Sequence, residues 1–349
     1  MRCVWAVAAC LVGLAALPNA GFAGEGLQAK TPEKSTALIR LNGVGSGIGY
    51  VPASLGVLLG DGTVRPLFVE DGQVDFGAPQ PMRGGQQVRP HNILPDGEIT
   101  HGTNDIARAW LTDPTQRYAH GVLGDAIEAG GLVLEGRAGR QFHYLLDSGT
   151  VFEDRRVRLV DLDGNGRDEA VVIQSYLDEG AALSVFALGA DGVDVVSEVP
   201  AIGRLNRWLN PVGAADFDGD GVIELAYVET PHIGGKLRLY EFRDGRLVFD
   251  VAASGFSNHA IGSREQDQSA VVDWNGDGII DIALPDARRR ALRVVTFANG
   301  QFRELAHIAH THKIVSAVRA GVMGADEDVF IVHILADGTL HAVPVPGGV

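Results

Sequence analysis

Cysteine is nearly absent from this chain of 349 residues, and the two that occur, Cys3 and Cys10, lie close to the N-terminus. A chain that loses this N-terminal segment keeps no thiol, so we expect neither disulfide bonds nor a cysteine nucleophile. Stability must then come from the buried core or from bound ions.

Basic side chains are also in short supply. Lys and Arg number 29 against 44 Asp and Glu, which gives a formal net charge of −15. Nucleic acids and anionic membranes are disfavoured as partners, because both would repel so acidic a surface. After residue 23 no apolar run is long enough to cross a bilayer as a helix, so no transmembrane segment is expected.

The motifs of several enzyme classes are missing too. The chain has no G-x-S-x-G nucleophile elbow and no phosphate-binding G-x-x-x-x-G-K loop. Glycine, in contrast, is abundant at 46 residues, and 46% of the chain is hydrophobic. This composition is typical of a folded protein with many tight turns rather than of a disordered chain.

The N-terminus has the pattern of a secretory signal peptide. Arg2 precedes a nearly unbroken apolar run from Val4 to Leu17, and the small residues around Ala23 suit a signal peptidase. We therefore expect residues 1–23 to be removed on export to the periplasm or the extracellular space. Residues 24–35 are polar and are predicted to be a flexible lead-in to the folded domain.

Three Asp/Gly-rich loops dominate the rest of the chain: Asp161–Glu169, Asp216–Glu224 and Asp273–Asp281. Each places side-chain oxygens at positions 1, 3, 5 and 9, glycine at positions 4 and 6, and a backbone carbonyl at position 7. Hard oxygen ligands on a tight, glycine-containing turn suit Ca²⁺. Recurrence at a nearly constant interval indicates repeated structural units.

The predicted calcium ligands fall into three sets, one for each loop. They are Asp161, Asp163, Asn165, Arg167 and Glu169 in the first loop; Asp216, Asp218, Asp220, Val222 and Glu224 in the second; and Asp273, Asn275, Asp277, Ile279 and Asp281 in the third. An ion-free hairpin turn is the alternative for any one loop. Three filled ligand sets favour about three Ca²⁺ sites.

The loops do not match an EF-hand, because position 12 lacks the bidentate Glu and strands rather than helices are expected on either side. They resemble the calcium loops of FG-GAP or VCBS-type repeats, which build the β-propellers of integrin α-subunits and of many bacterial secreted proteins. The resemblance covers roughly residues 120–345 and implies a propeller fold with bound calcium. It implies no particular activity, because the family includes adhesins, lyase domains and scaffolds.

Strand-like segments around the loops predict an all-β propeller of four-stranded antiparallel blades in one domain, residues 36–349. Apolar/polar alternation and turns such as Asp244-Gly245 and Asn299-Gly300 mark antiparallel hairpins. Six blades can be counted, and a seventh is allowed if residues 78–118, a poorly readable insertion or degenerate blade, contain one. We expect the ring to close by pairing of a strand near Ala37–Leu41 with the run Thr339–Pro344.

The segments that cross from blade to blade should emerge at the end opposite the calcium loops, where a propeller usually binds its ligand. The candidates for this ligand face are Trp208, Asn210, His259, Arg264 and His312. The alternative is an ordinary set of crossing loops whose polar groups satisfy one another. The run from His307 to His312 contains three histidines, but neither a helical His pair nor a nearby Cys supports a transition-metal site there.

Two functions are compatible with these features. The first is an exported, calcium-stabilised propeller that binds a protein or glycan partner without catalysis. The second is a propeller enzyme of the polysaccharide-lyase or dehydratase type, which needs ionisable residues that converge on the ligand face, such as His259 with Arg264. We favour the binding function, because the clustered acids sit where calcium needs them and no second carboxylate pair stands out.

Overall fold

The computed structural model describes residues 26–41, 53–82, 89–323 and 328–347. Within these ranges the regular structure is β-strand throughout, apart from one short 3₁₀ turn at Ala298–Gly300. No helix in the described part of the chain is long and apolar enough to cross a membrane. The predicted signal peptide, residues 1–23, lies outside the described residues.

The strands form five antiparallel sheets. The first contains β2 (Ser35–Arg40), β3 (Leu55–Leu59), β4 (Thr63–Glu70), β5 (Gln73–Phe76) and β6 (Gln80–Pro81). The second has nine strands: β7 (Thr100–His101), β8 (Ile106–Thr115), β9 (Glu128–Gly136), β10 (Gln141–Leu145), β11 (Thr150–Phe152), β12 (Arg158–Val160), β13 (Glu169–Tyr176), β14 (Gly180–Leu188) and β15 (Val193–Glu198).

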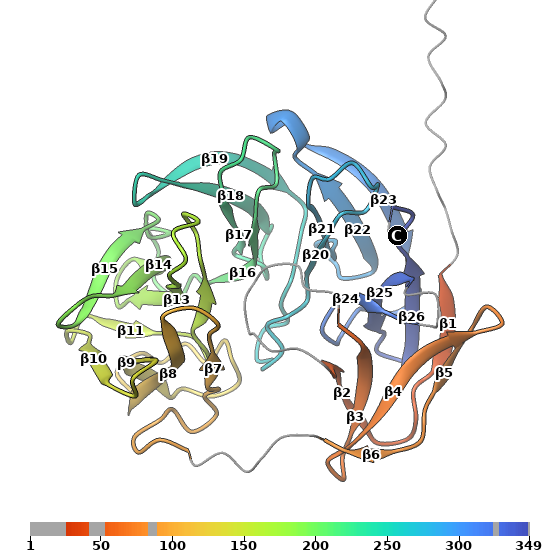
Figure 1. The fold of residues 1–349 in the computed structure, drawn as a ribbon, viewed down its shortest axis with the longest axis horizontal. Coiled ribbons are helices and arrows are strands. Elements are labelled where there is room, and N and C mark those ends of the chain that lie inside the picture. The colour runs from red at the N-terminus through yellow and green to blue at the C-terminus, as the bar shows by residue number, and fades with distance from the viewer. Residues whose placement is uncertain (1–25, 42–52, 83–88, 324–327, 348–349) are drawn as a thin grey trace, which may run out of the picture.

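The remaining three sheets have four strands each. They comprise β16 (Leu209–Ala215), β17 (Glu224–Glu229), β18 (Lys236–Arg243) and β19 (Arg246–Ser254); β20 (Ala270–Val272), β21 (Asp281–Pro285), β22 (Ala291–Thr296) and β23 (Arg303–Ala309); and β24 (Arg319–Val322), β25 (Val329–Ile334), β26 (Thr339–Pro344) and β1 (Leu27–Lys30). Figure 1 shows the sheets following one another around a common centre, which is the arrangement of a β-propeller.

Apolar side chains fill the spaces between consecutive sheets. One cluster joins β13 and β14 to β17 and includes Trp208 and Tyr227, and another joins β20–β22 to β24–β26. Further clusters lie between β8–β9 and β13–β14, between the β16–β19 and β20–β23 sheets, and between β24–β26 and β2–β5. Among the described residues no such cluster joins the first sheet to β7–β9. Packing between neighbours therefore holds the array together around most of the ring.

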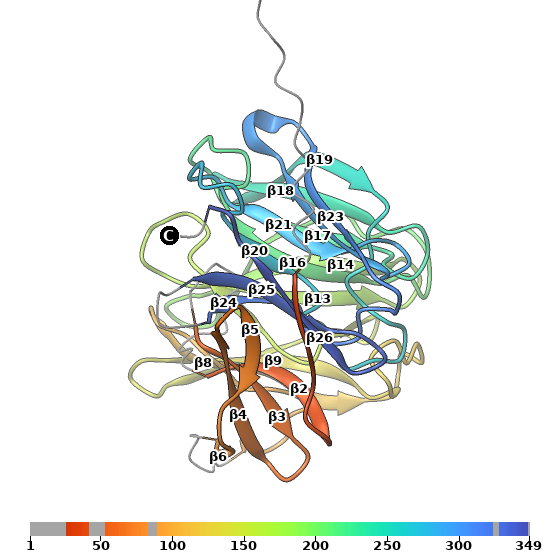
Figure 2. The same cartoon turned by 90° about the vertical axis from the view of Figure 1, so that its right-hand side faces the viewer.

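Closure of the ring differs from the prediction. The strand that pairs with β26 is β1, with Leu27 opposite Ala342 and Lys30 opposite Thr339, and Figure 2 shows the two lying alongside each other. The segment near Ala37–Leu41 instead pairs with β3. The expectation of a flexible lead-in at 24–35 was therefore wrong for β1. Backbone hydrogen bonds between β1 and β26 cover the edge of β26 and hold β1 in place. The polar composition of residues 24–35 does not predict this pairing.

Residues 78–118, which were hard to assign from the sequence, contain β-strands. β7 and β8 belong to this segment, and β8 pairs with β9 along most of its length. The short strand β11 then pairs with both β9 and β13, which joins what would otherwise be two separate sheets. The hairpins predicted at Asp244-Gly245 and Asn299-Gly300 are present between β18 and β19 and between β22 and β23.

Candidate functional site

The three acidic loops connect consecutive antiparallel strands, β12 to β13, β16 to β17 and β20 to β21. In each loop the glycines at positions 4 and 6 have positive φ, for example 85° at Gly219 and 90° at Gly221. A side chain with a Cβ rarely adopts this backbone. Glycine therefore lets the chain turn tightly enough to bring the oxygens at positions 1, 3, 5 and 9 together.

Two hydrogen bonds recur in all three loops. In the second loop, the carboxylate of Asp216 accepts from the backbone N–H of Gly219 at 2.7 Å and of Gly221 at 2.9 Å, and Glu224 accepts from Phe217 at 2.7 Å. Equivalent bonds from the N–H at position 6 to the carboxylate at position 1, and from position 2 to position 9, order the first and third loops. The shared sequence spacing thus gives the same two backbone-to-carboxylate hydrogen bonds in every loop.

The loops differ in how tightly their acids gather. Asp216, Asp218, Asp220 and Glu224 bring carboxylate oxygens within 4.8 Å of one another, as do Asp161, Asp163 and Glu169 in the first loop. Of the residues that the structure describes, the acids of the third loop form no such group. There the side-chain amide of Asn275 donates to Asp277 at 2.9 Å.

Burial makes the position-9 carboxylates costly to keep charged. Glu224 and Asp281 are fully buried, and one oxygen of each has no hydrogen-bond partner in the described structure. Burial, followed by the charges of neighbouring acids, raises the pKa of Glu224 to about 8 and that of Glu169 to about 7. In Asp281, where burial again dominates, the pKa rises to about 6. Unpaired buried oxygens of this kind fit a bound cation.

Two adjoining pockets lie at the opposite end of the strands, where the crossing segments emerge. The larger, of about 530 Å³, is lined by four cations, Arg288, Arg289, Arg290 and Lys313, and we call it the arginine pocket. The smaller, of about 220 Å³, is lined by His120, Trp208 and Ile233 among others, and we call it the histidine pocket. His232 and Ile261 line both.

The cations of the arginine pocket lack acidic partners. In the described part of the chain none of the four forms an ion pair with a carboxylate. Arg289 donates from Nη1 to the carbonyl of His259 at 2.6 Å, and Arg290 donates from Nη1 to the carbonyl of Thr311 at 2.9 Å. Burial without a compensating anion lowers the pKa of Arg289. The arginine pocket is therefore a positively charged region on a protein whose net charge is negative.

The histidine pocket has a buried acid behind it. His120 Nδ1 lies 2.6 Å from Oε1 of Glu153, which is fully buried and also accepts from Ser175 Oγ at 2.6 Å. His232 Nε2 lies 2.8 Å from Nδ1 of His259. Burial is the main cause that lowers the pKa of His232 to about 4 and that of His259 to about 3, so both rings are neutral at neutral pH.

Three of the five predicted ligand-face residues lie close together but are buried. Trp208 donates from Nε1 to the carbonyl of Glu153 at 3.0 Å and lies with its ring centroid 4.6 Å from that of His259. Asn210 donates to the carbonyls of Asn258 and Gln266, at 3.1 and 2.8 Å. Trp208 lines the histidine pocket, whereas Asn210 and His259 lie in the core and offer no free surface.

The other two lie apart from this group. Arg264 is exposed and pairs with Asp96 and Asp125, so its charge is already matched. His312 is exposed, beside Thr311 and 3.8 Å from Asp337. The side chains of His259 and Arg264 have different partners and do not form a pair.

Sequence reasoning missed the cationic pocket and the pair of His120 with Glu153. The run Arg288-Arg-Arg290 is a visible signal, but a run of charge on a turn usually faces solvent. His120 and Glu153 lie far apart in the chain, and no local pattern joins them. Lys313, between β23 and β24, is also distant in sequence from the three arginines with which it lines the pocket.

No protein-family model and no curated protein matches this chain. Among solved structures, "Structure of Dos1 propeller" is similar with a TM-score of 0.41 and 10% identity, covering 83% of this chain and 64% of that one. The exotype rhamnogalacturonan lyase YesX gives a TM-score of 0.43 and 18% identity, with 86% and 57% covered. The structure of BBS1N in complex with ARL6DN is similar with a TM-score of 0.38 and 12% identity, and the match covers 93% of this chain and 94% of that one. The chain thus spans less than two thirds of the length of the first two.

Proposed function

We propose that this protein is an exported, calcium-stabilised β-propeller that binds an acidic glycan in the arginine pocket. The observation that carries the proposal is a pocket lined by four cations without carboxylate partners among the described residues, in a chain with a net charge of −15. Export rests on the signal-peptide pattern of residues 1–23. The calcium loops and the pocket occupy opposite ends of the strands and have separate tasks.

Calcium fits the acidic loops better than an ion-free turn does. Asp216, Asp218, Asp220 and Glu224 would repel one another at the distances found, and Glu224 keeps a buried oxygen without a partner among the described residues. A bound Ca²⁺ neutralises this repulsion and ties the first two strands of a unit together. We assign the same role to the first and third loops and place the chain in the FG-GAP/VCBS group.

We further propose six four-stranded units. The nine-stranded sheet divides into β7–β10 and β12–β15, with β11 as the link between them. Each half then has the strand order of the separate four-stranded sheets. The last unit takes its fourth strand, β1, from the N-terminal side of the chain, which joins the two ends of the array.

A sugar acid matches the chemistry of the pocket. Arg288, Arg289 and Arg290 offer planar donors that suit a carboxylate, and an incoming anion would compensate the half-buried, unpaired charge of Arg289. Ile261, which lines the arginine pocket beside the cations, and Ile233, which lines the adjoining histidine pocket, are highly exposed, with 70% and 64% of their surface accessible. Their apolar side chains fit the C–H face of a sugar ring, while the cations fit its carboxylate.

The test is calorimetric titration of the calcium-loaded protein with an oligogalacturonate and with a neutral gluco-oligosaccharide. We expect binding of the acidic ligand alone, weakened as salt increases, because the contacts are charge-assisted. The double variant Arg288→Gln/Arg290→Gln should lose at least tenfold in affinity. Arg246→Gln is the control, since Arg246 is exposed on the hairpin between β18 and β19, away from the pocket.

Equal binding of the neutral and the acidic oligosaccharide would overturn the proposal, and so would wild-type affinity in the double variant. Binding of an acidic peptide with no binding of the glycan would replace the glycan with a protein partner at the same pocket.

Lyase activity is the second candidate, and the pair of His120 with buried Glu153 favours it. In β-elimination a base removes the proton from C5 of a uronate and the electron pair forms the C4=C5 double bond. The C4–O bond breaks, and the departing oxygen takes up a proton. His120, oriented by Glu153, would be the base, and the arginine pocket would hold the carboxylate.

A panel of polyuronides tests this reaction through the ultraviolet absorbance of the unsaturated product. Product formation that is lost in His120→Gln, with glycan binding retained, would establish the lyase. Binding without product from any polyuronide would leave the protein as a binding module.

A further inference from the structure

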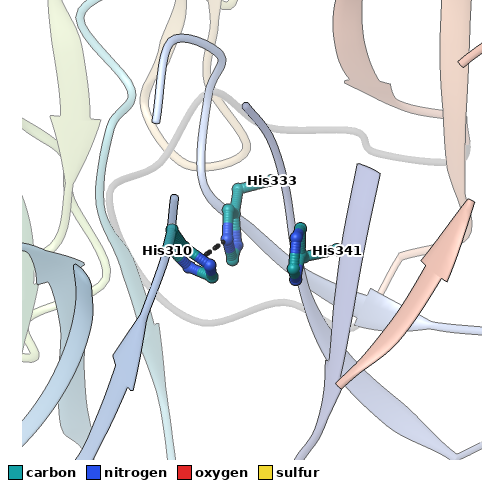
Figure 3. Close-up of side chains that lie close together, drawn as sticks. All are labelled: His310, His333 and His341. Atoms are coloured by element: carbon teal, nitrogen blue, oxygen red, sulfur yellow. Dashed lines mark hydrogen bonds between the residues drawn. The ribbon is translucent and has the colours of Figure 1, made fainter. Parts of the chain in front are cut away.

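Three histidines from two neighbouring sheets meet outside both the acidic loops and the pockets. His333 on β25 and His341 on β26 are directly opposite each other in the strand register, so their side chains leave the same face. That face also carries Ile331 and Val343, which pack toward the β20–β23 sheet. His310 follows β23 in that sheet, and Figure 3 shows the three rings side by side.

The imidazole nitrogens are close enough to share an ion. One nitrogen from each ring lies within 4.8 Å of the other two. Nε2 of His333 and Nε2 of His310 are 2.9 Å apart, and the rings of His333 and His341 stack with their centroids 5.5 Å apart. Tetrahedral Zn²⁺ with Zn–N bonds of about 2.0–2.1 Å places its ligands about 3.3 Å apart. Small side-chain movements would therefore reach metal geometry.

Without a bound ligand the three histidines lower the stability of the folded protein. His333 is fully buried, and Nδ1 of both His333 and His310 finds no hydrogen-bond partner among the described residues. A buried polar atom left without a partner destabilises the fold. Burial, followed by the neighbouring histidines, also lowers the pKa of His333 far below its ordinary value, and burial lowers that of His310 to about 4. Neutral imidazole is the form that binds a metal.

We propose that His310, His333 and His341 form a binding site for a late first-row divalent cation, of the Zn²⁺ class. Imidazole nitrogens suit zinc, copper and nickel, whereas Ca²⁺ requires oxygen ligands. Asp286 and Asp337 act electrostatically on His310 and His341, respectively, and both favour a positive charge in the cluster. The site shares no residue with the calcium loops or with the arginine pocket, and the N–H of His310 donates to the carbonyl of Arg290, which lines that pocket.

The position of the site gives it a structural consequence. It joins β23 of the fourth sheet to β25 and β26 of the fifth, and β26 also carries the closing strand β1. An ion held by both sheets binds the folded protein better than the unfolded chain, so it raises stability. Zinc would therefore lock the last unit of the ring onto the preceding one.

The test uses the full protein, treated with EDTA and then dialysed into buffer that contains no transition metal and about 1 mM Ca²⁺, which saturates modest-affinity oxygen sites. After equilibration with Zn²⁺ and dialysis, elemental analysis should find one zinc per chain. Co²⁺ in its place should give the visible absorption of a tetrahedral site. His310→Ala and His341→Asn should each weaken binding by on the order of 100-fold or more, because loss of a ligand costs more than the roughly 10–100-fold that loss of an outer-shell partner costs.

The matched controls are His307→Ala and His312→Ala, which remove exposed histidines of the same segment. Both should keep wild-type affinity for Zn²⁺. His310 is only partly buried and lies outside the strands, so its removal preserves folding, which circular dichroism checks. Absence of stoichiometric zinc in the wild type, or wild-type affinity in folded His310→Ala, would overturn the proposal.

Discussion

Replacing Glu224 with Gln should stabilise the protein in EDTA and reduce its response to calcium. One oxygen of this fully buried carboxylate accepts from Phe217, while the other has no partner among the described residues. Glutamine keeps the accepting oxygen and places an amide donor beside Asp216 and Asp218. Satisfying a buried acceptor is worth about 1–3 kcal/mol, so we expect a gain of that size without calcium.

With calcium the variant loses this advantage. A site filled at 100 times its dissociation constant contributes about 2.7 kcal/mol to stability, and the variant loses this contribution from the second loop. At about 2 °C per kcal/mol for a chain of this size, the calcium-induced rise in melting temperature should shrink by roughly 5 °C. The variant should thus be more stable than wild type in EDTA and respond less to calcium. An ordinary turn without an ion would not show the smaller calcium response.

The assay is differential scanning calorimetry of both proteins in EDTA and in calcium. Glu70→Gln is the control, because Glu70 is exposed at the end of β4 and its change should stay within about 0.5 kcal/mol. A Glu224→Gln protein that melts lower than wild type in EDTA yet keeps the full calcium increment would refute the reasoning.

Three further outcomes follow from the structure. Burial, and then the charge of Glu153, raises the pKa of Glu128 from 4.5 to about 9, so the folded state holds a proton that the unfolded chain releases. The resulting stability falls as the pH rises, by about 2–3 kcal/mol between about pH 6 and 8, and urea titrations should show this slope reduced in Glu128→Gln; an unchanged slope would contradict the assignment. Deletion of residues 1–30 removes β1 and exposes the edge of β26, so the melting temperature should fall and light scattering should report aggregation, unlike deletion of 1–25; equal behaviour of the two truncations would contradict the closure. Asp154→Ala leaves Arg158 buried without its partner, now 2.6 Å away, and should cost about 3–5 kcal/mol in urea unfolding; a loss below about 1 kcal/mol would show that the pair is not needed.

The acidic loops could be predicted from the sequence, because the residues that form each loop lie within a stretch of nine. Aspartate at position 1 reaches the N–H of position 6 through local chain geometry, and glycine at positions 4 and 6 permits the turn. The Asp-Gly and Asn-Gly hairpins were predictable for the same reason. Residues 78–118 were not, because β8 is stabilised by pairing with β9, and β7 by pairing with β8, rather than by a strong pattern of their own.

The ligand face was harder to predict, because burial decides which polar residues are available. Trp208 and His259 have the residue types of a binding site, yet packing places both in the core. Arg289 stands in a run of three arginines, but only the tertiary structure shows that no carboxylate of the described residues pairs with its charge. Ion pairing likewise depends on tertiary position, as Arg264 shows by meeting Asp96 and Asp125.

The sequence by itself determined the repeating units, the turns and the oxygen-lined loops, because each depends on residues that are neighbours in the chain. Only the tertiary structure decided which strand closes the ring, which cations remain unpaired and which histidines meet. His333 faces His341 through the register of two strands, and His310 reaches them from another sheet. Contacts between distant segments depend on how sheets pack, and no local pattern of residues encodes that.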